Sequence, residues 1–160
     1  MAGEGVLAAA LRARMEEECE LTARLLGMLP EGSEGWRPPY DGFSCGELAA
    51  HLVDTMAGFC AALGRRRDGW EWGREAAIEE SRRWFGNFRE DAMERISAVG
   101  DEGLRRVVPT VFAPEGQPLL AILLANLAHL INHKHQLFTY LKLMGLEVGS
   151  RDLYRFRDAR

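Results

Sequence analysis

The sequence predicts an all-α protein, a four-helix bundle. Four long segments carry apolar residues every three or four positions, which is the period of an amphipathic helix. Glycine- and proline-containing breaks separate these segments, and the alternating strand and helix pattern of an α/β protein is absent. With 160 residues and 47% hydrophobic content, we expect one domain over residues 1–160, built around one core.

The first helix is predicted over residues 4–29, where leucines and Met15 keep the helical spacing and Pro30 ends it. The second begins at Ser44, because Ser44-Cys-Gly-Glu47 has the spacing of a capping box. The third helix is predicted over residues 73–99, with Gly100 ending it.

Residues 105–112 are β-branched and extended in character, and Pro109 excludes a central strand. We therefore expect a short extended segment inside a long crossover before the last helix. Pro118 suits the first turn of that helix, which should run to Met144 with Gly145 as its C-terminal cap.

Charge and apolar pattern exclude several function classes. The formal net charge of -4 argues against a nucleic-acid partner, and no apolar run approaches the roughly 18 residues of a membrane span. The N-terminus lacks the basic and apolar segments of a signal peptide, so a cytoplasmic location is expected. Cys19, Cys45 and Cys60 form no CxxC pair, which favours reduced thiols, with Cys60 in the core.

A polar stripe runs along the apolar last helix. Its members are spaced three and four residues apart and so share one face: Asn126, His129, His133, Gln136 and Tyr140. Polar groups sunk in such a helix need partners, which are other protein groups or a metal ion.

His129 and His133 have the spacing with which one helix offers two imidazoles to one metal. His51, one turn into the second helix, completes a three-histidine set if those two helices are neighbours. Three neutral imidazoles suit Zn or Ni, with Fe or Cu as alternatives, and leave positions open for water or substrate. His135 points about 200° away from His133 and is expected at the surface or an interface.

Two carboxylates lie near His51 along the second helix. Glu47 precedes it by four residues and Asp54 follows it by three, so either could orient the imidazole as a hydrogen-bond acceptor. The alternative is that Glu47 only caps the helix and Asp54 is solvated.

Together these motifs resemble the DinB/YfiT-like superfamily of metal-dependent bundles. Trp36-Arg-Pro before Phe43-Ser-Cys-Gly-Glu-Leu-Ala-Ala-His51 is similar to the family's loop and second helix. His129-x-x-x-His133-Lys-x-Gln136, followed by Tyr140, is similar to its last helix, with Lys134 at the usual Arg and His135 at the usual Gly. The long connection before the last helix also matches.

The resemblance implies an up-down-down-up bundle, a metal site at His51, His129 and His133, and a homodimer. The superfamily contains thiol-dependent transferases and isomerases. A metal-dependent hydrolase or a bacillithiol- or mycothiol-dependent S-transferase acting on a small molecule is therefore expected. Two alternatives stay open at this point: a non-catalytic, stress-associated metal-binding dimer, and histidines that merely satisfy one another.

Overall fold

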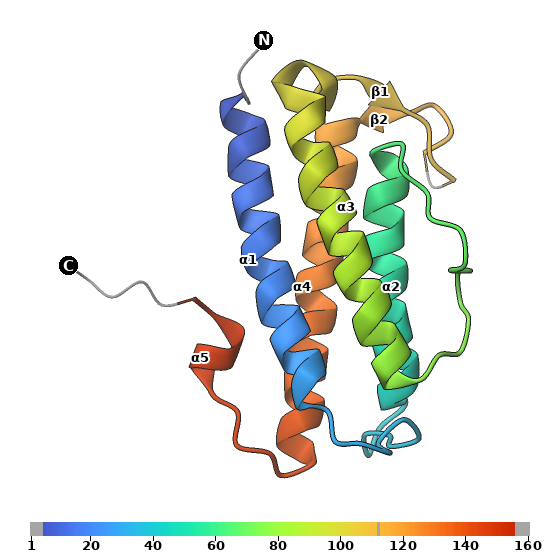
Figure 1. Cartoon of the computed structure of the whole chain (residues 1–160), viewed down its shortest axis with the longest axis vertical. Coiled ribbons are helices and arrows are strands. Elements are labelled where there is room, and N and C mark those ends of the chain that lie inside the picture. The colour runs from blue at the N-terminus through green and yellow to red at the C-terminus, as the bar shows by residue number, and fades with distance from the viewer. Residues whose placement is uncertain (1–4, 112, 156–160) are drawn as a thin grey trace, which may run out of the picture.

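The computed structural model describes residues 5–111 and 113–155. It is a four-helix bundle, as predicted, formed by α1 (Val6–Met28), α2 (Cys45–Ala62), α3 (Ile78–Leu104) and α4 (Leu119–Leu143). In Figure 1, α1 and α4 run in one direction while α2 and α3 run in the other, which is the up-down-down-up arrangement. Within the described ranges, no helix has the length and apolar character needed to cross a bilayer.

The helix boundaries follow the local signals in most places. The capping box is formed, with Ser44 Oγ accepting from the Glu47 amide at 3.2 Å and the Glu47 carboxylate accepting from the Ser44 amide at 2.6 Å. The third helix differs from the prediction, since α3 begins at Ile78 and continues to Leu104. Gly100, with φ 62 and ψ 177, kinks it where an end was predicted, and Gly145 follows α4 with φ 86.

Three connections join the four long helices, and the first, residues 29–44, leads from α1 to α2. Residues 105–118 link α3 to the antiparallel α4 and carry a small hairpin in which β1 (Val107–Val108) pairs with β2 (Gln117–Pro118). The predicted extended segment thus contributes β1, while residue 112 within it lies outside the described part of the chain. Residues 63–77 join the parallel helices α2 and α3, and this is the connection that runs along the side of the bundle in Figure 1.

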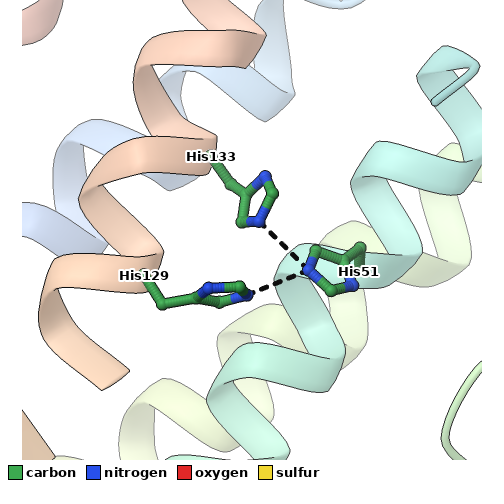
Figure 2. Close-up of side chains that lie close together, drawn as sticks. All are labelled: His51, His129 and His133. Carbon is green, nitrogen blue, oxygen red and sulfur yellow. Dashed lines mark hydrogen bonds between the residues drawn. The ribbon is translucent and has the colours of Figure 1, made fainter. Parts of the chain in front are cut away.

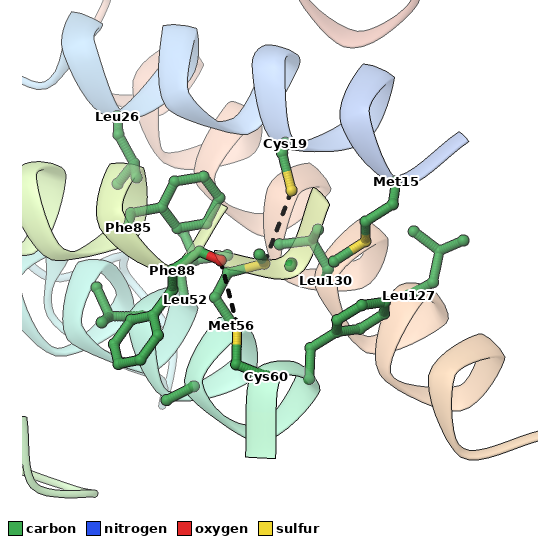
Figure 3. Close-up of a cluster of buried hydrophobic side chains, with 14 of the residues drawn as sticks. Met15, Cys19, Leu26, Leu52, Met56, Cys60, Phe85, Phe88, Leu127 and Leu130 are labelled. Atoms are coloured by element: carbon green, nitrogen blue, oxygen red, sulfur yellow. Dashed lines mark hydrogen bonds between the residues drawn. The ribbon is translucent and has the colours of Figure 1, made fainter. Parts of the chain in front are cut away.

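The core lies between the four long helices. Figure 3 shows Met15 and Cys19 from α1, Met56 from α2, Phe85 from α3 and Leu130 from α4 converging there. All five are at most 1% exposed. Each large apolar side chain buried in this way contributes about 1.5–3 kcal/mol to the free energy of unfolding, so the helices are held rigidly around the site described below.

The face of α4 toward α1 carries a buried ion pair. The Lys134 side chain is 1% exposed, and its Nζ donates to Glu18 Oε2 on α1 at 2.6 Å and to the Leu153 carbonyl at 2.8 Å. Leu153 belongs to α5 (Ser150–Leu153), a short helix that was not predicted from the sequence. Glu18 also contacts Arg14, so both buried charges have partners.

His135 lies near the same segment and corrects one expectation. We expected it at the surface or an interface, but it is half-buried and its ring lies 6.0 Å from that of Tyr154, centroid to centroid. Its Nε2 is buried with no hydrogen-bond partner within the described chain. The C-terminal segment folds back over this face of α4, which helical phase alone does not reveal.

Candidate metal centre

The bundle brings together the three predicted histidines. Figure 2 shows His129 and His133 projecting from adjacent turns of α4 toward His51 on α2. His51 Nε2 lies 3.0 Å from His129 Nε2 and 3.1 Å from His133 Nε2. Nitrogen atoms of all three lie within 4.8 Å of one another, so the cluster has the spacing of a ligand set. His51 and His133 are half-buried and His129 is exposed, which places the cluster where solvent can reach it.

The spacing of the ring nitrogens fits a divalent metal ion. Zinc binds imidazole nitrogen at about 2.0–2.1 Å, and tetrahedral geometry then separates two ligand nitrogens by about 3.3 Å. The two Nε2 separations from His51 are a few tenths of an ångström shorter, a difference that small side-chain rotations remove. Three neutral nitrogen donors are also the ligand type that borderline transition metals prefer.

A chain of hydrogen bonds fixes which nitrogen of His133 faces the cluster. The Tyr140 hydroxyl donates to the Phe43 carbonyl at 2.8 Å and accepts from Gln136 Nε2 at 3.1 Å. Gln136 Oε1 must then face His133 Nδ1, 2.8 Å away, and accept its proton. His133 Nε2 is left with its lone pair directed at His51, as a metal ligand requires.

The histidines cannot fully satisfy one another. Because neutral His133 carries its proton on Nδ1, its Nε2 is an acceptor. If His51 Nε2 carries a proton, it can direct that proton at one of its two neighbours; if it carries a lone pair, it opposes the lone pair of His133. One close contact is therefore unfavourable in the neutral cluster, which counts against histidines that merely bond to each other. A cation between the three nitrogens would accept all three lone pairs.

Electrostatics favour the neutral form that a ligand needs. Burial lowers the pKa of His51, the neighbouring His133 and His129 lower it further, and Asp54 opposes them. Burial and His133 likewise lower the pKa of His129. Both rings are therefore neutral to a lower pH than a free imidazole, and a metal ion competes with fewer protons for them.

A cavity opens beside His51. Its volume is about 550 Å³, and its wall is formed by the loop before α2, the first turns of α2 and the end of the connection to α3. Phe43 lines it and packs its ring 5.0 Å from the ring of His51 and 6.0 Å from that of His133, centroid to centroid. A small molecule in the cavity would therefore lie next to the histidine cluster.

The two carboxylates near His51 have other partners. Glu47 caps α2, as one of the two alternatives stated, and also pairs with Arg37 at 2.9 Å. Asp54 is neither solvated nor bonded to His51: it is 5% exposed and accepts from Trp70 Nε1 at 2.8 Å and from the Gly73 amide at 3.1 Å. Asp54 thus holds the α2–α3 connection against α2, a contact with a distant loop that helical spacing could not indicate.

The cysteines offer no activated thiol. All three are free and buried, and Cys60 lies in the core as predicted, donating to the Phe88 carbonyl at 3.2 Å. Burial raises the pKa of Cys45 to about 11 and that of Cys60 to about 12, and raises the pKa of Cys19 further. These thiols stay protonated at neutral pH, so none has the thiolate character of a nucleophile.

Sequence reasoning placed Gln136 and Tyr140 on the polar stripe without assigning them a role. Their role is the hydrogen-bond chain that orients His133, and the signal was their three- and four-residue spacing after His133. Phe43 was noted only as part of a motif, and its ring contact with His51 is a feature of the folded loop.

Comparison with known proteins gives one family. The model of the DinB superfamily matches residues 14–137. Among solved structures, a DinB-like protein from Bacillus subtilis, YjoA, superposes with a TM-score of 0.69 over 87% of this chain and 94% of that chain, at 16% sequence identity. At that identity the likeness concerns the fold alone. No curated protein matches the chain in sequence.

Proposed function

Because the chain belongs to the DinB superfamily, we propose that His51, His129 and His133 bind one divalent transition metal ion through their Nε2 atoms. The observation that carries this proposal is the convergence of three ring nitrogens, one of which has its lone pair fixed toward the cluster. Imidazole ligands suit Zn or Ni first, with Fe or Cu as alternatives.

We further propose that the centre is catalytic, either as a hydrolase or as a low-molecular-weight-thiol-dependent S-transferase. A bound divalent ion would supply Lewis-acid chemistry, lowering the pKa of a water or thiol that it holds. The chain's own residues would contribute the rest: Gln136 fixes the ring of His133, and Phe43 packs against His51 where the cavity admits a small molecule.

Two observations favour this reading over a non-catalytic metal-binding bundle. In residues 5–111 and 113–155, no fourth histidine, cysteine or carboxylate joins the group, so a coordination position stays open. The cavity also reaches His51, whereas a structural site is usually closed. The homodimer stays a prediction that rests on the family resemblance. The cytoplasmic location stays a prediction that rests on the unpaired cysteines and on the N-terminal sequence pattern.

Metal analysis tests the proposal directly. Protein purified without a nickel column, analysed by plasma mass spectrometry after incubation with Zn, Ni, Fe or Cu, should hold about one ion per chain. His51→Ala, His129→Ala and His133→Ala should each lose most of it, because two imidazoles rarely hold an ion in an open site. His135→Ala is the matched control and should keep its metal. A parent that binds no ion, or a His51→Ala variant that keeps it, would overturn the three-histidine site.

A further inference from the structure

We propose that the cavity beside His51 receives the positively charged end of a small molecule, an ammonium or guanidinium group. The cavity assignment stands on its own geometry, while calling that molecule the substrate rests on the proposed function. The argument depends on how the charged side chains of the cavity wall are paired.

Both cations of the wall are already used in protein contacts. Arg37 donates to the Gly42 carbonyl and to Glu47, each at 2.9 Å. Arg74 donates to the Gly69 carbonyl at 2.9 Å and to Glu80 at 2.7 Å. Its guanidinium also lies 5.1 Å from the centroid of the Trp70 ring. These partners hold both guanidinium groups in place and offset their charge.

Three carboxylates of the wall have no cationic partner among the described residues. Asp54 is nine-tenths buried, and both its oxygens accept from uncharged N–H groups, those of Trp70 and Gly73. Glu34 is half-buried and Glu75 exposed, and neither makes an ion pair or a side-chain hydrogen bond in the described chain. Once Arg37 is paired with Glu47 and Arg74 with Glu80, the wall keeps an excess of negative charge.

A concave site lined by one sign of charge concentrates ligands of the opposite sign. The exposed part of Phe43 adds an aromatic ring, which attracts a cation through its negative face. Without a metal ion on His51, the cavity should therefore select cations and disfavour anions.

The test uses three probes of similar shape and different charge: benzylammonium, benzoate and benzyl alcohol. Each is titrated into ¹⁵N-labelled protein as purified, and again after the metal has been removed with a chelator, with binding followed by amide chemical shifts around Phe43 and His51. The chelated sample isolates the cavity, since benzoate can also coordinate a metal ion. We expect benzylammonium to bind about tenfold more tightly than benzoate in that sample at low salt, and the ratio to shrink as salt is added.

Two charge-removing variants locate the effect. Glu34→Gln and Glu75→Gln should each weaken benzylammonium binding about threefold and leave benzyl alcohol unchanged. Glu31→Gln is the matched control, because Glu31 is exposed and does not line the cavity. Benzoate binding as tightly as benzylammonium, an unchanged ratio in both Glu variants, or no binding by any probe would overturn the proposal. Because the chelated sample contains no metal, any of these results leaves the metal site to be judged separately by metal analysis.

Discussion

The polar side chains on two faces of α4 differ in how completely they are hydrogen-bonded. The face toward α1 buries Lys134, whose ammonium group has a carboxylate and a carbonyl as partners at 2.6 and 2.8 Å. The face toward α2 carries His129 and His133, whose nitrogens converge on His51 without a full set of hydrogen bonds. Lys134 and His133 are neighbours in sequence, so a single turn of α4 directs one polar side chain toward α1 and another toward α2.

One face carries a polar group that has all its partners, and the other carries polar groups that lack a full set. A buried charge that is completely paired holds elements together and has no capacity left for a ligand. Three ring nitrogens that converge without a full set of hydrogen bonds lack a common partner, and a cation would satisfy them all once each presents its lone pair. The following predictions test whether the two faces really differ in this way, beginning with the largest expected effect.

The Lys134 face should matter for stability and not for metal. Glu18→Leu leaves the Lys134 ammonium with one carbonyl, and we expect the free energy of unfolding to fall by about 3–5 kcal/mol in urea denaturation. Lys134→Met should cost less, since Arg14 still contacts Glu18. The double variant Glu18→Leu, Lys134→Met should regain most of the loss. Each folded variant should bind metal like the parent; a loss of metal in the double variant would show that the two faces are coupled.

The histidine face should give stability only through metal. An ion that binds only the native state at a hundredfold excess over its Kd adds about 2.7 kcal/mol. Chelator should therefore lower the Tm of the parent and of His135→Ala, and should barely move that of His51→Ala, measured by calorimetry. An equal response to chelator in His51→Ala would mean that α2 supplies no ligand.

The hydrogen-bond chain behind His133 should tune metal affinity. Gln136→Leu removes the acceptor that holds the His133 tautomer, and loss of such a group typically weakens metal binding about 10–100-fold. Tyr140→Phe should have a smaller effect, because Gln136 keeps its contact with His133. Asn132→Leu is the control, because it also replaces a side-chain amide by leucine, at an exposed position of α4. The metal affinities are measured by competition titration with a chromophoric chelator. Equal affinities for Gln136→Leu and Asn132→Leu would remove Gln136 from the site.

Lowering the pH should gradually weaken metal binding by the three histidines. Protons compete with metal below the free imidazole pKa of about 6.5, so affinity should fall from pH 7 to pH 5. The lowered pKa of His51 and of His129 makes their neutral forms persist further into acid. Protonation of an unshifted imidazole would lower the metal affinity about threefold between pH 7 and pH 6. Protonation of His51 or of His129 should therefore lower the metal affinity by less than that factor over the same range. Affinity that is flat down to pH 5 in isothermal titrations would contradict histidine ligation.

Local patterns in the sequence were enough for the helices and for part of the site. The period of the apolar residues predicted the four long helices, and Ser44 and Glu47 fixed the start of α2 because a capping box is a contact within one turn. The spacing of His129 and His133 was equally local. Joining His51 to them required the helix order, which came from the resemblance to a family and not from any spacing.

Contacts between distant segments could not be predicted in this way. Helical phase correctly directed His135 away from His133, but it could not show that residues 146–155 fold back and cover that face. In the same way, the spacing of Asp54 from His51 suggested a hydrogen bond that the structure does not contain. The actual donors, Trp70 and Gly73, belong to a loop whose path no local pattern specifies.

The separation between His51 and His129 also governs when the centre can form. The rings of His51 and His129 lie together although the residues are 78 positions apart in the sequence. The Phe43 carbonyl, which begins the hydrogen-bond chain to His133, lies 97 residues before Tyr140, whose hydroxyl donates to it. During synthesis, the first three helices emerge with a single member of the ligand set. The centre is complete only after α4 has left the ribosome and docked, when most of the chain is already in place. If the histidines bind a metal ion, metal loading would therefore report that the whole bundle has assembled.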